Sequence, residues 1–249
     1  MDHLHNYLLH LADNALILGH RNSEWCGHGP VLEQDIALTN ISLDLLGQAR
    51  YFYQYAASRA GAGVTEDSLA YLRDTREFKN FLVLELPDSD WGFTVLRQYL
   101  FSQYQYLLYE KLVDASDQEI AAIAEKSLKE VAYHVRWSKE WVIRLGDGTT
   151  ESRKKMIASW NILKDYVGEF FIASDEEKML TESNMAVDPV TLREKWISLV
   201  NPVFEEATLE FRLQKWTQQG GRQGMHTEHL GYLLAEMQYM QRTYPGMEW

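Results

Sequence analysis

The chain has 249 residues, of which 46% are hydrophobic and 12% aromatic, so it can bury a sizeable core and is not a disordered protein. A net charge of −12 without any run of lysine or arginine excludes a nucleic-acid-binding protein, and the single cysteine, Cys26, excludes a disulfide framework or a cysteine-ligated metal within the chain. No stretch approaches about 18 uncharged apolar residues and the N-terminus has no signal-peptide pattern, so we expect one soluble, cytoplasmic domain over residues 1–249, with no membrane partner.

Apolar residues recur at helical spacing along the whole chain, and no alternation typical of β-strands interrupts them. The predicted fold class is therefore all-α. In chain order, this pattern and its glycine, proline and capping residues predict helices over residues 4–19, 31–60, 66–76, 91–115, 117–145, 152–172 and 189–214, with a last helix from residue 227.

The second predicted helix is apolar in nearly every direction, which predicts that it is central and buried. A few polar residues break this pattern and fall within roughly one quadrant of the helix, at about 100° per residue. They are Glu33, Asn40, Asp44, Gln48 and Tyr51. Because buried polar groups need partners, this polar seam is expected to face other polar side chains or water.

The helix predicted over residues 117–145 carries Glu130 and His134, which come close to the pattern of a di-iron helical bundle and miss it. In such bundles a glutamate and a histidine three residues apart bind the metal from each of two helices. Here the spacing is four, and none of the eight histidines has a glutamate three residues before it. The sequence therefore favours a bundle that has lost its iron site.

As iron ligands, Glu130 and His134 would need further partners from the other helices. Asp44 would lie opposite them, and Asp13 and Glu110 are the candidates for the remaining carboxylates. A second histidine would be needed on the helix of Asp44, where the sequence offers Gly47 or Gln48, and neither is a good iron ligand. The iron interpretation therefore depends on ligands that the sequence supplies only in part.

The alternative interpretation is a hydrogen-bonded network at the same positions. In it, Glu130 and His134 form a buried hydrogen bond that Asp44, Asn40 and Gln48 complete. Loss of iron leaves carboxylates that repel one another, which favours their replacement by asparagine, glutamine or glycine. We favour this interpretation, in which Asp44, Gln48, Glu130 and His134 are vestigial positions and the chain has no catalytic residue, metal or cofactor of its own.

Two further candidates lie near the C-terminus. His226, Glu228 and His229 have a spacing that suits one transition metal, but we favour a simpler role, in which Thr227 caps the last helix. Arg222, in the preceding glycine-rich turn, is a candidate contact for an anionic ligand such as a phosphate of coenzyme A. Neither pattern is specific.

Two more features leave alternatives open. Cys26 beside His28 suggests a thiol–imidazole pair, yet a lone cysteine is usually packed as a small hydrophobe. The tail over residues 240–249 is rich in aromatic and methionine side chains and is expected to dock either on this chain or on a partner.

A resemblance to a known family covers nearly the whole chain. Its strongest segments are residues 24–28, 40–50, 226–231 and 235–239, supported by 187–189 and 245–246. These segments resemble the C-type subunits of the bacterial phenylacetyl-CoA 1,2-epoxidases, the oxygenases of phenylacetate degradation. The resemblance implies a ferritin-like helical bundle with additional helices.

The resemblance also implies membership of a multicomponent monooxygenase. In that assembly a sister subunit of the same fold holds the di-iron centre and binds the coenzyme A thioester, while a reductase with FAD and an iron–sulfur centre supplies electrons from NADPH. The complex inserts one oxygen atom of O2 into the ring of phenylacetyl-CoA. The C-type subunit is regarded as the structural partner of the oxygenase subunit in a heterodimer, which we expect to pair again into a heterotetramer.

We therefore expect a structural, non-catalytic subunit that stabilises the di-iron oxygenase subunit. One alternative is that the chain is itself a di-iron oxygenase subunit, using the carboxylates and His134 described above. Another is a module that binds coenzyme A through Arg222 and the region of His226. A homodimer of the isolated chain also remains open.

Overall fold

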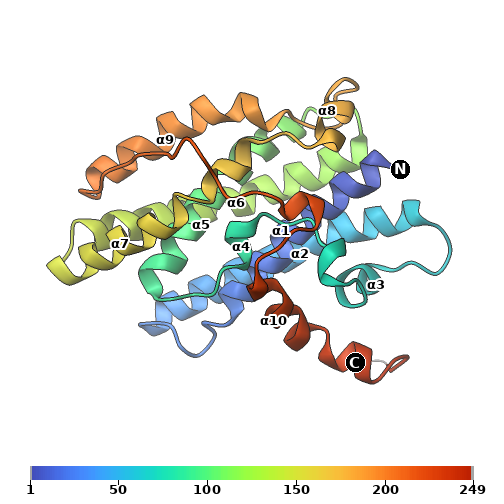
Figure 1. Cartoon of the computed structure of the whole chain (residues 1–249), viewed down its shortest axis with the longest axis horizontal. Helices are drawn as coiled ribbons and strands as arrows, with labels where there is room; N and C mark the ends of the chain where they lie inside the picture. Colours follow the sequence, from blue (N-terminus) through green and yellow to red (C-terminus); the bar gives the residue numbers. More distant parts are fainter. Residues whose placement is uncertain (1, 248–249) are drawn as a thin grey trace.

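Every regular element is a helix in residues 2–247, the part of the chain that the computed structural model describes (Figure 1). Four long helices form the bundle: α1 (His3–Ser23), α2 (Leu32–Ala60), α5 (Trp91–Leu112) and α6 (Gln118–Gly146). The shorter helices are α3 (Glu66–Tyr71), α4 (Leu82–Glu85), α7 (Thr150–Leu163), α8 (Asp175–Thr181), α9 (Arg193–Glu206), α10 (Glu228–Met237) and α11 (Tyr239–Thr243), with 3₁₀ helices at 75–77, 167–171, 189–192 and 221–223. The predicted fold class, an all-α ferritin-like bundle with additional helices, is confirmed.

The bundle consists of two helix pairs. Helix α1 packs along α2, α5 packs along α6, and the pairs meet where α2 contacts α6. In Figure 1, α7 and α9 lie beside α5 and α6, and α10 leads the chain away from the bundle toward its C-terminus. The buried apolar side chains of these elements form one core cluster.

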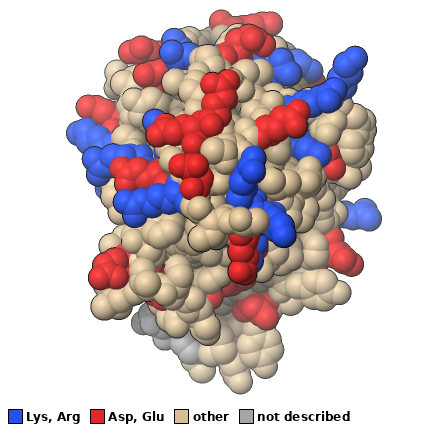
Figure 2. All heavy atoms as spheres, turned by 90° about the vertical axis from the view of Figure 1, so that its left-hand side faces the viewer, with Lys and Arg blue, Asp and Glu red and all other residues tan. Residues whose placement is uncertain are grey.

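The surface carries charges of both signs. Figure 2 shows the left-hand side of Figure 1, where acidic and basic side chains are interspersed and uncharged surface separates them. In the part of the chain that the structure describes, no helix combines the length and the apolar character that crossing a membrane requires.

The central helices are α1 and α5, and the prediction that the second helix is buried on all sides is wrong. Residues 7–19 of α1 and 92–105 of α5 are buried without interruption. By contrast, three large apolar side chains of α2 face solvent: Leu32 is 72% exposed, Ile36 52% and Leu43 60%. Helix α2 packs on α1 and α6 along one side, so these side chains on its other side are left uncovered by the described residues.

Helix α9 ends earlier than predicted, at Glu206, because the chain turns against the end of α6. Gly146, the last residue of α6, lies so close to Ala207 that a Cβ atom there would overlap with the Ala207 carbonyl oxygen. The chain then continues without helix, and Phe211 stacks on Trp160 with 5.5 Å between ring centroids. The segment after Glu206 therefore packs on α7 through this aromatic contact and does not continue the predicted helix.

The helix predicted over residues 152–172 is divided into two elements. Helix α7 ends at Leu163, and the 3₁₀ helix at 167–171 places Phe170 and Phe171 in the core. The sequence also gave no indication of α8, which has seven residues and therefore shows little periodicity.

Candidate functional site

The polar seam of α2 faces α6, and side chains from both helices pair across it. Asp44 Oδ2 lies 2.9 Å from His134 Nε2, and Gln48 Nε2 donates to Glu130 Oε2 at 2.9 Å. The two helices run in opposite directions, so the four-residue spacing on each brings both pairs into register. Gln105 of α5 donates to Gln48 Oε1 at 3.0 Å. The structure thus brings together the four positions that the sequence singled out.

The pairing within this network differs from the expected one. Among the described residues, Glu130 and His134 bond to α2 rather than to each other, and Asn40 is exposed and lies outside the network. Gln105 was not predicted to take part. The sequence feature that could have indicated it is that Gln105 is a polar residue on a helix buried on all sides, so its side chain needs a partner inside the protein.

The environment of Glu130 changes the pKa of its carboxyl group. Burial raises the pKa of its carboxyl group above the ordinary value, the hydrogen bond from Gln48 opposes this, and the carboxylate of Asp44 raises the pKa further. The network contains two carboxylates and is half-buried at Glu130 and buried at His134.

The remaining candidate carboxylates lie away from the network. Asp13 is fully buried in an ion pair with Arg73, accepts a hydrogen bond from Tyr53, and also accepts one from the backbone N–H of Lys79 at 2.7 Å. Glu110 is exposed at the end of α5. Among the described residues, neither Asp13 nor Glu110 contributes its carboxylate to the network of α2 and α6.

The donor set does not fit a di-iron centre. Such a centre in a helical bundle uses four carboxylates and two histidines. The network here has two carboxylates and one imidazole, and Gln48 turns its amide N–H toward Glu130, so that it acts as a donor where a ligand must accept. Within residues 2–247, no group of three or more His, Cys, Asp or Glu side chains is arranged to hold a metal ion.

The histidines near the C-terminus have structural positions. The His226 ring is buried, with Nδ1 3.0 Å from Glu85 Oε2 and Nε2 2.9 Å from the Phe78 carbonyl oxygen. The Thr227 hydroxyl accepts from the N–H of His229, so the predicted cap of α10 is confirmed. As far as the described residues go, the two imidazoles do not converge on one metal position.

His226 is expected to make the stability of the chain depend on pH. Burial by itself would lower its pKa, but the hydrogen bond and the charge of Glu85, with the Phe78 carbonyl, outweigh burial and raise the pKa. The stabilisation is therefore fully present below the pKa of about 6.5 in the unfolded chain, and is lost as pH rises through the higher folded value. We expect His226→Gln to lower the thermal midpoint most near pH 6.

This prediction is checked by thermal unfolding of both proteins from pH 6 to pH 9. The difference between the midpoints of the wild type and His226→Gln should shrink as pH rises, and it isolates this group because all other groups titrate in both proteins. A difference that stays constant would contradict the assignment.

Arg222, the candidate contact for an anionic ligand, is engaged within the chain. Its side chain is buried and pairs with Glu177 at 2.5 Å, and its guanidinium lies over the Phe81 ring at 4.7 Å. Nη1 also donates to the carbonyl oxygen of Ile172. This arginine ties the glycine-rich turn to α8.

Cys26 is exposed, so the expectation that it packs as a small hydrophobe is wrong. His28 Nδ1 lies 3.1 Å from the carbonyl oxygen of Cys26, a backbone contact that leaves the thiol out. The described part of the tail docks on this chain, since Arg242 Nη2 donates to the Arg73 carbonyl oxygen at 2.9 Å. Residues 248–249, at the end of the predicted tail, lie outside the described residues.

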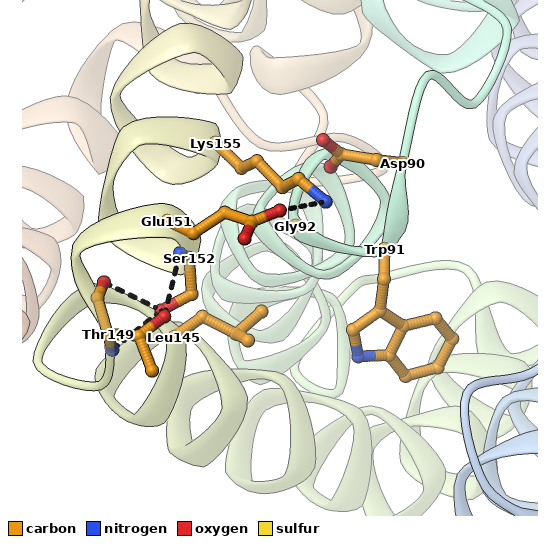
Figure 3. Close-up of a pocket in the computed structure, with 8 residues that line it drawn as sticks. All are labelled: Asp90, Trp91, Gly92, Leu145, Thr149, Glu151, Ser152 and Lys155. Carbon is orange, nitrogen blue, oxygen red and sulfur yellow. Dashed lines mark hydrogen bonds and ion pairs between the residues drawn. The ribbon is translucent and has the colours of Figure 1, made fainter.

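A pocket of about 220 Å³ lies between the N-terminal ends of α5 and α7 (Figure 3). Its polar side chains are engaged: Lys155 lies 3.5 Å from Glu151, Ser152 bonds with Thr149 in a capping box, and Asp90 accepts from the N–H of Phe93. Trp91 forms the opposite wall. The pocket therefore offers helix caps and a surface ion pair, not a nucleophile with a base.

Comparisons with known proteins agree with the resemblance seen in the sequence. The family model described as phenylacetic acid catabolic protein matches residues 1–249. The C-type subunit of the 1,2-phenylacetyl-CoA epoxidase of Escherichia coli (strain K12) is 47% identical over 249 residues, which cover 100% of both chains.

Proposed function

Because the chain belongs to the phenylacetic acid catabolic protein family, we propose that it is the C-type subunit of a phenylacetyl-CoA 1,2-epoxidase and serves there as a structural, non-catalytic subunit. The observation that carries the non-catalytic role is the network of α2 and α6, in which Asp44 pairs with His134 and Gln48 donates to Glu130 instead of leaving a ligand position for iron. In this proposal the chain works in the cytoplasm, in aerobic phenylacetate catabolism.

The proposed partner is the sister oxygenase subunit, which has the same fold, holds the di-iron centre and binds the coenzyme A thioester. A reductase with FAD and an iron–sulfur centre completes the complex, and this chain contributes no cofactor. A catalytic bundle that opens for a bulky substrate exposes apolar helix faces, and a partner of the same fold can cover them through a large interface. We propose a heterodimer that pairs again into a heterotetramer.

Two alternatives remain distinct from this proposal. A di-iron oxygenase made from this chain alone would need ligands beyond Asp44, Glu130 and His134, and the positions of Asp13 and Glu110 speak against it. A coenzyme A module in this region would need a cation other than Arg222, which is engaged with Glu177.

Iron content tests the non-catalytic role directly. After anaerobic reconstitution with Fe(II) and desalting, the isolated chain is expected to retain close to no iron by elemental analysis, because its donor set is incomplete. The sister oxygenase subunit, treated in the same way, serves as the positive control. About two irons per chain would overturn the proposal and make Glu130 and His134 ligands.

His134→Ala separates structural from catalytic contributions. The substitution leaves the Asp44 carboxylate without its imidazole partner, so we expect the free energy of unfolding to fall by about 1–3 kcal/mol. Turnover per assembled complex should stay at the wild-type value. Loss of turnover in a complex that assembles normally would instead place His134 in the catalytic machinery.

A further inference from the structure

One side of α2 is apolar, exposed and left uncovered by the described part of the chain. At about 100° per residue, Leu32, Ile36, Leu43 and Gly47 fall within roughly 60° of each other around the helix. We call these four residues the outer face of α2. The three apolar side chains are 72%, 52% and 60% exposed in chain order, so a stripe of about three turns offers large aliphatic groups to solvent.

Gly47 leaves an open position on this face, because no neighbour within the described part of the chain fills it. Glycine is the least favourable residue in a helix interior apart from proline, and a helix normally keeps one where a close neighbour excludes a side chain. A Cβ atom at Gly47 would meet nothing within 4 Å. The open position leaves room for the backbone of a partner to approach α2 closely.

The edge of the outer face that adjoins α6 is acidic. The Asp44 side chain is 35% exposed, and Glu130 beside it is half-buried. Lys126 of α6 lies over the Tyr51 ring at 4.1 Å, and its charge lowers the pKa of Glu130 without forming an ion pair with it. The face thus combines aliphatic groups with carboxylates that form no ion pair with a lysine or arginine of residues 2–247.

We propose that the outer face of α2 is the surface that binds the sister oxygenase subunit. One helix of that subunit lies along Leu32, Ile36 and Leu43, approaches closely at Gly47, and brings a lysine or arginine to Asp44 and Glu130. This inference rests on the proposed function, which supplies a partner of the same helical fold.

Charge favours this partner over a second copy of the chain. In a two-fold symmetric dimer the same patch faces itself, so the carboxylates of Asp44 and Glu130 would be brought toward those of the other copy. Like charges at an interface oppose association. A different chain can supply free cations at this position, whereas the cations of this chain near the face, Arg50 and Lys126, already contact Glu66 and Tyr51.

The experiment is capture of the sister oxygenase subunit by the full-length tagged chain after co-expression. Gly47→Leu fills the open position, so the isolated variant should keep or raise its thermal midpoint while its affinity for the oxygenase subunit falls at least about tenfold. Leu43→Arg should weaken capture by a similar factor, because it sets a cation among aliphatic groups. A folding defect cannot explain lost capture in a variant that is at least as stable as the wild type.

The matched control is Ile157→Arg, which changes another exposed aliphatic residue, 42% exposed on α7, in the same way as Leu43→Arg. Capture by this control should equal that of the wild type. If both α2 variants capture the oxygenase subunit normally, the outer face of α2 is not the binding surface, and the proposed function is unaffected. No capture by the wild type would overturn the proposed function itself.

A light-scattering measurement on the isolated chain completes the test. If the wild type is a dimer and Leu43→Arg a monomer, while capture of the oxygenase subunit is unchanged, the outer face binds a second copy and the proposal is wrong. A wild type and a variant with the same mass, together with lost capture, support it.

Discussion

Arg73→Met is expected to destabilise the chain by about 3–5 kcal/mol, because it leaves a buried carboxylate without its counter-charge. Asp13 is fully buried, and Arg73 is its ion-pair partner. Tyr53 and the backbone N–H of Lys79 complete the contacts of the carboxylate, but neither carries a compensating charge. Urea unfolding followed by circular dichroism measures the loss.

Two controls define what this loss means. Asp13→Leu combined with Arg73→Met removes both charges, so the double variant should recover much of the stability that the single variant loses. Lys155→Met breaks the exposed pair with Glu151 and should leave the unfolding midpoint nearly unchanged. A double variant no more stable than Arg73→Met would show that packing, rather than the unpaired charge, is lost.

Gly221→Ala is expected to cost at least about 2 kcal/mol, since it forces backbone apart in a buried turn. A Cβ atom at Gly221 would overlap with the carbonyl oxygen of Asn80. The shift needed to relieve this overlap also disturbs the Glu169 carboxylate, which accepts the N–H groups of Gly220 and Gly221 at 3.0 Å each. Thermal unfolding of the variant checks the prediction.

Gly231→Ala provides a control of opposite sign. Gly231 lies inside α10, and a Cβ atom there would meet nothing within 4 Å. Alanine is the better helix former by about 1 kcal/mol, so this variant should be more stable than the wild type. If the two glycine substitutions change the stability equally, local crowding does not determine the cost of Gly221→Ala.

The long helices were predictable because their signals are local. An apolar period of about 3.6 residues and a capping side chain lie within a few residues of the element they define. Asp90 caps α5, Asp117 caps α6, and both helices begin within a residue of the predicted position. The prediction failed where a tertiary contact determines the conformation, as at Phe211, whose ring stacks on Trp160 beyond the end of α9.

Four members of the candidate site were predictable, but their pairing and the part of Gln105 were not. The spacing of Asp44 and Gln48 on one helix, and of Glu130 and His134 on another, places each pair on one face. Which member meets which depends on how far one helix slides along the other, and no local pattern encodes that distance. The buried partner of Arg222 is equally invisible in the sequence, since Glu177 lies on a separate helix.

By itself, the sequence determined the all-α class, the family, and the absence of any glutamate three residues before a histidine. These properties are held in short spacings or in the order of the residues. Only the tertiary structure decided that α1 and α5 form the centre while Leu32, Ile36 and Leu43 remain exposed. The reason is that an apolar side chain looks the same in a sequence whether it faces its own core or a partner, and only the arrangement of neighbouring helices distinguishes the two.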